Sequence, residues 1–185
     1  FIDSAAGIAN QGRIVTTSLD TSGAIVNHGL LAASGDLAAT AIVNRSGGTM
    51  RVQEGQTLAL GNFKAQRYAD ITNEAGGLLD LRGTLDARNA TITNRYGGVI
   101  RFDGGTLKLN QDLHNNGTLQ VGRGGGTLDG GLTNLQGSIV LDGNTLAVSG
   151  AVTNHGTIAG GGTLDGRLLN ADGGTVRLSG NDTLV

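Results

Sequence analysis

Aspartates are the residues of this 185-residue chain with the most potential for chemistry, because it contains no cysteine and only three histidines. Polysaccharide-degrading enzymes need acidic groups that converge on one face, as general acid and base or as calcium ligands. The aspartates considered for this role are Asp80, Asp86, Asp103, Asp129, Asp142 and Asp165. Because they are spread along the chain and several alternate with basic residues, we interpret them as solvated surface positions and predict no catalytic residue.

Histidines offer no better metal site. His28 and His155 each follow an asparagine and precede a glycine, which is typical of a turn, and His114 is the only other imidazole. The absence of cysteine also excludes disulfides and thiolate metal sites. We therefore predict no metal and no cofactor.

Two glycine-rich motifs have alternatives that we weighed and set aside. Gly124–Asp129 and Gly160–Asp165 both read GGGTLD, similar to the calcium-binding pattern GGxGxD. However, Thr127 and Thr163 replace its third glycine, and the copies lie 36 residues apart instead of in tandem. The glycines of residues 122–126 resemble a phosphate loop, but no GK[ST] and no predicted helix follow them.

A short repeat runs through the chain and explains most of its composition. The unit is an apolar residue, any residue and Asn, then glycine two to four residues later, then two apolar residues in alternation. The nine asparagines are spaced by 20 residues on average: Asn10, Asn27, Asn44, Asn73, Asn94, Asn115, Asn134, Asn154 and Asn170. A second motif, Thr-Leu, recurs at Thr57, Thr84, Thr106, Thr127, Thr145, Thr163 and Thr183.

Alternation of apolar and polar residues predicts strands in every unit. The inward position after each glycine holds Ile14, Leu31, Met50, Leu79, Ile100, Leu119, Ile139, Ile158 and Val176. A helix is disfavoured because each interior glycine would cost about 1 kcal/mol relative to alanine. One unit cannot bury its apolar face alone, so it must stack on its copies. The sequence predicts an all-β, right-handed parallel β-helix (β-solenoid), a single domain over residues 1–185 with about nine coils of about 20 residues and three short strands per coil.

Stacking in register makes two further predictions about columns of side chains. Arg51, Asp80 and Arg101 should lie side by side on successive coils with alternating charge, and so should Asp86, Lys108 and Asp129. The asparagines should form a structural ladder, since an amide both donates and accepts hydrogen bonds and asparagine tolerates the left-handed backbone of a corner.

The repeats resemble those of a known family. Residues 132–176, which contain LTNLQGSIV, VTNHGTIAG and LLNADGGTV, are similar to the repeats of filamentous-haemagglutinin-like exoproteins of two-partner secretion and of autotransporter passenger domains. The resemblance covers nearly the whole chain. It implies export to the bacterial cell surface and a role as a stalk or adhesin, and it brings no catalytic motif.

The unit between Asn44 and Asn73 is 29 residues long and breaks the pattern. We expect an inserted loop near residues 61–70 that carries Phe63, Lys64, Arg67 and Tyr68. Aromatic and basic residues suit a contact with a partner, and the alternative is that the loop folds over the coil and buries Phe63 and Tyr68. Aromatic platforms for sugar rings are otherwise scarce, at 3% of residues.

Function is therefore expected from the scaffold rather than from an active site. The leading hypothesis is a non-catalytic, extracellular structural or adhesive stalk, part of a longer repeat protein, with a host-surface or glycan receptor as partner. The alternatives are a fibre whose subunits associate head to tail through open solenoid ends, and a polysaccharide-degrading β-helix enzyme. A net charge of −2 without a basic stripe argues against nucleic acid. No run approaches the roughly 20 apolar residues of a membrane span.

Overall fold

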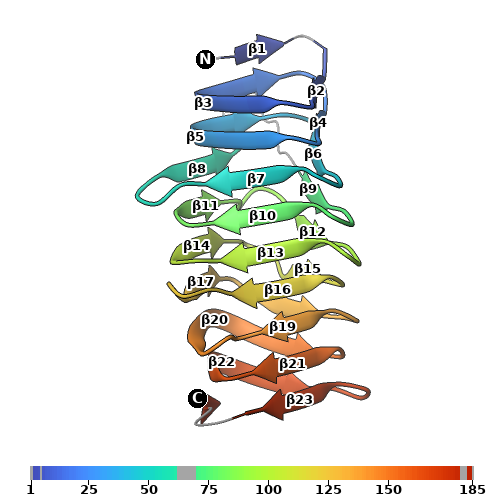
Figure 1. The fold of residues 1–185 in the computed structure, drawn as a ribbon, viewed down its shortest axis with the longest axis vertical. Coiled ribbons are helices and arrows are strands. Elements are labelled where there is room, and N and C mark those ends of the chain that lie inside the picture. The colour runs from blue at the N-terminus through green and yellow to red at the C-terminus, as the bar shows by residue number, and fades with distance from the viewer. Residues whose placement is uncertain (1, 5, 62–69, 180–182, 185) are drawn as a thin grey trace.

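The computed structural model describes residues 2–4, 6–61, 70–179 and 183–184, and the fold is an all-β solenoid. Its strands pair only in parallel, and successive coils stack along one axis (Figure 1). The described residues contain no helix, and so none that could span a membrane. The all-β parallel solenoid predicted from the repeat is confirmed.

Strands of the first face end at the asparagines. They are β2 (Ile8–Asn10), β4 (Ile25–Asn27), β6 (Ala41–Asn44), β9 (Asp70–Asn73), β12 (Ile92–Asn94), β15 (Leu113–Asn115) and β18 (Leu132–Asn134).

The second face follows the glycine turns. It comprises β7 (Thr49–Val52), β10 (Leu78–Leu81), β13 (Val99–Phe102), β16 (Thr118–Val121), β19 (Ser138–Val140), β21 (Thr157–Gly160) and β23 (Thr175–Leu178). Two longer strands begin here and continue onto the third face, β3 (Arg13–Thr21) and β5 (Leu30–Ala38).

The third face carries the Thr-Leu motif. It comprises β1 (Ile2–Ser4), β8 (Thr57–Leu60), β11 (Thr84–Asp86), β14 (Gly105–Lys108), β17 (Gly126–Asp129) and β24 (Thr183–Leu184). β20 (Asn144–Asn154) and β22 (Gly162–Asn170) start on this face and run without a break onto the first face of the next coil. The nine asparagines are joined by eight pairings and so bound eight turns, one fewer than the nine repeat units suggest.

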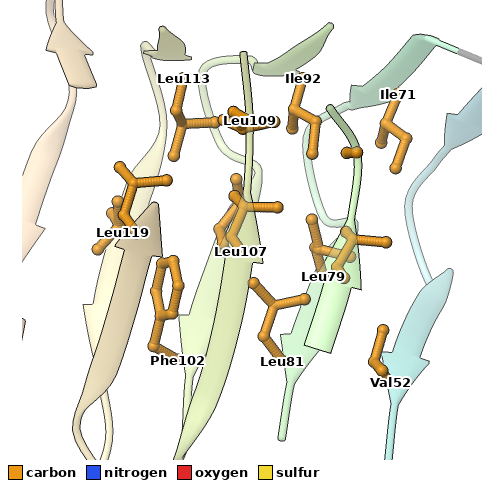
Figure 2. Close-up of a cluster of buried hydrophobic side chains, with 14 of the residues drawn as sticks. Val52, Ile71, Leu79, Leu81, Ile92, Phe102, Leu107, Leu109, Leu113 and Leu119 are labelled. Atoms are coloured by element: carbon orange, nitrogen blue, oxygen red, sulfur yellow. The ribbon is translucent and has the colours of Figure 1, made fainter. Parts of the chain in front are cut away.

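Aliphatic columns fill the inside of the solenoid. Each predicted inward residue from Ile14 to Val176 is the register partner of the next. The seven between these two ends are fully buried, whereas Ile14 and Val176 are partly buried against the same core. Figure 2 shows such side chains directed into the space between strands. Full burial of a leucine or isoleucine stabilises by roughly 1.5–3 kcal/mol, so the columns supply the main force for stacking.

Among the described residues, Phe102 is the one aromatic side chain in this core, and it fits because its neighbour is small. A Cβ added at Gly126 on the next coil would lie 2.4 Å from the Cβ of Phe102. Glycine at that point of β17 therefore makes room for the ring.

The Thr-Leu column contains a register shift that the repeat did not predict. Thr57, Thr84, Thr106 and Thr127 pair in order, and so do Thr145, Thr163 and Thr183. Between the two groups, Thr127 pairs with Ala147 instead of Thr145. The preceding turn has positive φ at both Asp142 and Gly143, and β20 starts directly after it. Because the shift is two residues, the alternation of faces is kept and Leu128 stacks on buried Val148.

Candidate functional site

The structure places all nine predicted asparagines in one column. In each of the eight steps the Nδ2 group of one asparagine donates to Oδ1 of the next, over 2.6–2.8 Å. The asparagines from Asn27 to Asn154 are fully buried. This arrangement is a continuous amide ladder along the solenoid axis.

Backbone carbonyls use the remaining donor capacity of the ladder. Asn94 Nδ2 also donates to the carbonyls of Gly98 at 3.2 Å and Thr118 at 3.1 Å, and the ladder members from Asn27 to Asn154 repeat this pattern. Every described buried side-chain nitrogen and oxygen has a hydrogen-bond partner. The ladder therefore fastens neighbouring coils and has no free polar atom inside for a ligand.

The prediction that the asparagines adopt a left-handed backbone conformation is wrong. Asp142, with φ of 47°, is the only non-glycine residue of the described chain with positive φ. The asparagines are the last residues of extended strands, and glycines take the strained position of the turns that follow. Hydrogen bonding, rather than tolerance of an unusual φ, is thus the physical role of asparagine here.

Asp80 is the one predicted surface carboxylate that the structure buries completely. Its carboxylate accepts from Arg51 Nε at 2.7 Å and from Arg101 Nη2 at 3.0 Å, as the column predicted. Arg82, which the column did not include, adds Nε at 3.2 Å. Burial would raise the pKa of Asp80, but the hydrogen bonds from Arg51 and Arg101 and the charges of Arg101 and Arg82 outweigh it and hold the pKa below its usual value. The three guanidinium groups cover the carboxylate, so it is not open to a substrate.

The second charged column keeps its register but differs in its contacts. Asp86 pairs with Lys108 and Lys108 with Asp129 on successive strands. The ion pair of Asp86 is nevertheless with Arg88, two residues along the chain, whose Nε donates to Oδ1 at 2.9 Å. That hydrogen bond is the main cause of a lowered pKa at Asp86. Asp129 instead accepts from the hydroxyl of Ser149 at 3.0 Å.

The remaining predicted residues are not brought together. Asp103 accepts from the backbone of Gly124 at 3.3 Å and lies 4.0 Å from Arg82. Within the described residues, no group of three or more histidine, cysteine, aspartate or glutamate side chains could hold a metal ion. The predicted contact residues Phe63, Lys64, Arg67 and Tyr68 lie outside the described residues.

Three successive turns between the first and second faces are longer than the Asn-x-Gly turns, and we name them the turn block: Arg45–Gly48, Glu74–Gly77 and Arg95–Gly98. Each is closed by a hydrogen bond from its last N–H to its first carbonyl, at 2.7–2.9 Å. The third residue of each is a glycine with φ of 74–80°, which a side chain would strain. Gly47 N donates to Gly76 O and Gly76 N to Gly97 O, so the turns are bonded to one another as strands are.

A hollow of about 710 Å³ lies along the turn block. It is lined by His28, Arg45, Ser46, Glu74, Ala75, Arg95, Tyr96, Asn116 and Gln136. Glu74 forms ion pairs with arginines of both neighbouring coils. Its Oε2 lies 3.2 Å from Arg45 Nε, and its Oε1 lies 3.9 Å from Arg95 Nη1. Tyr96 is 85% exposed at the tip of its turn.

Sequence reasoning missed this surface and Tyr96 in particular. The available signal was the length of the turn, since VNRSGG, TNEAGG and TNRYGG carry two more residues than the Asn-x-Gly form of Asn27–Gly29 or Asn115–Gly117. The repeat was defined with glycine two to four residues after asparagine, so the longer turns counted as ordinary variation in spacing. An aromatic residue at such a tip in a chain with two tyrosines would have been the clue.

Comparisons with known proteins add little to this geometry. No family model matches the sequence, and no curated protein matches it. Among solved structures, the chain is similar to a crystal structure of a TibC-catalysed, hyper-glycosylated fragment of TibA, at 15% sequence identity and a TM-score of 0.18, covering 98% of this chain and 99% of that chain. At such a score the likeness supports no inference about function.

Proposed function

We propose that this chain is a non-catalytic structural or adhesive stalk, a β-solenoid exported and displayed on the bacterial cell surface. The observation that carries the proposal is the unbroken amide ladder, which links all eight turns through buried hydrogen bonds. A ladder of this kind resists sliding and bending of the coils, as a stalk requires.

Use of the polar residues supports the same proposal. Asp80, which is fully buried, forms ion pairs with three arginines. The ladder amides form hydrogen bonds to each other and to the backbone. Because these polar groups are already used in contacts between coils, the arrangement favours a scaffold over a catalyst. The resemblance of the repeats to filamentous-haemagglutinin-like and autotransporter passenger repeats favours export by one of these two routes.

Surface display is tested by labelling intact cells of the producing bacterium with an antibody raised against the purified chain. Labelling without permeabilisation is expected. Signal that appears only after permeabilisation contradicts the proposal. A periplasmic marker probed in the same cells controls for leakage.

Shape and catalysis are tested on the purified chain. Electron microscopy should show short rods, whereas long uniform filaments would favour the alternative of a self-assembling fibre. Reducing-sugar assays over a panel of neutral and acidic polysaccharides should show no release. Saturable release of sugar would overturn the non-catalytic part of the proposal.

A further inference from the structure

The turn block is longer than the solenoid needs. At Asn10–Gly12, Asn27–Gly29, Asn115–Gly117 and Asn154–Gly156 the chain makes the same crossing with a single residue between asparagine and glycine. Those short turns keep the ladder and the register intact. The residues added in the block are therefore not required for the ladder, although they bond the three turns to one another, and loops on a rigid scaffold commonly bind ligands.

The block is a stiff platform rather than a loose loop. Its three turns are closed internally and bonded to each other through Gly47, Gly76 and Gly97. Preorganisation of this kind lowers the entropy lost on binding. The turn Ala171–Gly174 has the same closing hydrogen bond, at 2.9 Å, but presents neither an aromatic nor a basic side chain.

Tyr96 stands where the block ends and a short turn begins. It lines both the hollow of about 710 Å³ and a smaller one of about 260 Å³. Asn116 and Gln136 line both. A ring that is 85% exposed and lines two hollows together with two amide side chains can stack on a flat apolar face while neighbouring polar groups bond to hydroxyls.

Charges around the ring select among ligands. Arg45 and Arg95 lie on either side of Glu74 and give these three residues a net charge of +1. The side chains of Arg45 and Arg95 are 48% and 62% exposed, so each can offer further N–H groups to a carboxylate. Glu74 between them can accept from a hydroxyl, but it repels a closely spaced polyanion such as nucleic acid.

We propose that the turn block binds a carboxylate-bearing saccharide, with a pyranose ring on Tyr96 and the carboxylate on Arg95 or Arg45. The ligand class is set by the combination of an exposed aromatic ring, two arginines and two amides on one rigid, shallow surface. The inference rests on the proposed adhesive function, and it names the kind of receptor and the residues that contact it.

Binding is tested on the full chain by calorimetric or NMR titration with tetragalacturonate and with sialyllactose, which distinguish a uronic acid from a sialic acid. Methyl-esterified tetragalacturonate and lactose are the matched uncharged probes. At least one acidic probe should bind at millimolar or lower concentration and at least tenfold more tightly than its uncharged counterpart. Affinity should fall as salt is raised, since the arginines are exposed.

Variants locate the site. Tyr96→Ala should weaken binding at least tenfold and Tyr96→Phe less than threefold, because the ring is retained. Arg95→Gln should weaken it about fivefold or more, as the loss of a charge-assisted hydrogen bond implies. Val15→Ala, at an exposed site lining a different hollow, is the control and should leave affinity unchanged. Circular dichroism should be the same for all four variants.

The inference is overturned if neither acidic probe binds at ten times the millimolar concentration at which binding is expected, or if charged and uncharged probes bind with equal affinity. Unchanged affinity in Tyr96→Ala, or tighter binding of a single-stranded oligonucleotide than of the acidic saccharides, would also overturn it. The proposed function as a surface stalk can be refuted independently of this inference. Surface labelling of cells without saccharide binding removes only this inference, whereas saccharide binding by a chain confined to the cell interior removes only the stalk.

Discussion

The amide ladder and the turn block lie next to each other in three successive coils, yet they follow opposite rules. Asparagine occupies all nine ladder positions, fully buried over most of its length and bonded at nearly constant distances. One residue further along the chain the column reads Gln11, His28, Arg45, Glu74, Arg95, Asn116, Leu135, His155 and Ala171. Invariance within the chain marks what holds the fold, and variation marks what the fold is free to display.

Distance from the axis explains the contrast. An inward side chain must match copies directly above and below it, so one solution is repeated at every coil. A turn residue meets water on one side, so its side chain need not match a copy above and below it, although its backbone bonds to neighbouring coils. Side chains in the turns can therefore vary without loss of stacking, whereas those in the ladder cannot.

Asn94→Leu should be the most damaging single change. It removes the acceptor of Asn73, the donor to Asn115 and the donor to two carbonyls, all in the buried ladder. Buried polar groups left without a partner cost about 1–3 kcal/mol each, so we expect about 3–4 kcal/mol less stability in urea unfolding. Asn116→Leu, one turn further along the chain, should change stability by no more than about 0.5 kcal/mol. Equal costs at the two sites would remove the distinction between ladder and turn.

Gly98→Ala should be next, at about 2–3 kcal/mol. A Cβ at this position would lie 2.7 Å from Asn94 Oδ1 and 2.7 Å from the carbonyl of Asn73, so it would push into the ladder. Gly104 is the matched control, since it has φ of +84° and nothing within 4 Å of an added Cβ. Gly104→Ala should cost only about 1 kcal/mol, the strain of a left-handed alanine. Thermal unfolding of both variants measures the difference, and a larger loss for Gly104→Ala would contradict the close approach at the ladder.

Asp80→Asn should lower stability by about 1–2 kcal/mol at neutral pH. The change leaves three arginines without their common carboxylate, although their exposure to water moderates the repulsion. Because folding lowers the pKa of Asp80, its contribution is present above its unfolded pKa of about 3.9 and is lost as pH falls through the folded pKa. Urea unfolding from pH 7 to pH 2 should therefore show the wild-type advantage over the variant shrinking below about pH 4. An advantage that grows in acid would contradict this charge assignment.

Deletion of Tyr96 and Gly97 together should have the smallest effect on the fold. The shortened turn reads Asn-Arg-Gly, like the turn of Asn115–Gly117. It loses the hydrogen bond from Gly76 N to Gly97 O, which corresponds to about 1 kcal/mol. Far-ultraviolet circular dichroism should be unchanged and the urea midpoint only slightly lower. A deletion that unfolds the chain would show that the turn block is structural after all.

Period and alternation were sufficient to predict the columns, the core and the parallel solenoid, because each follows from neighbouring copies of one short unit. They did not predict features that depend on contacts outside a column. Arg82 reaches Asp80 from the edge of the column, and its charge helps to bury a carboxylate that was interpreted as solvated. The shift at Ala147 depends on the backbone of the Asp142–Gly143 turn. Tyr96 went unnoticed because a repeat pattern averages over the residues that do not repeat.

The most direct test of the contrast is amide hydrogen exchange on the wild-type chain, Asn94→Leu and the Tyr96–Gly97 deletion. The account predicts that Asn94→Leu speeds exchange in the coils on both sides of residue 94, across β9, β12 and β15. The deletion should speed it only within residues 74–77 and 95–98. Faster exchange across all three strands in the deletion variant, or unchanged exchange in Asn94→Leu, would contradict the claim that the ladder carries the fold while the turn block is free for recognition.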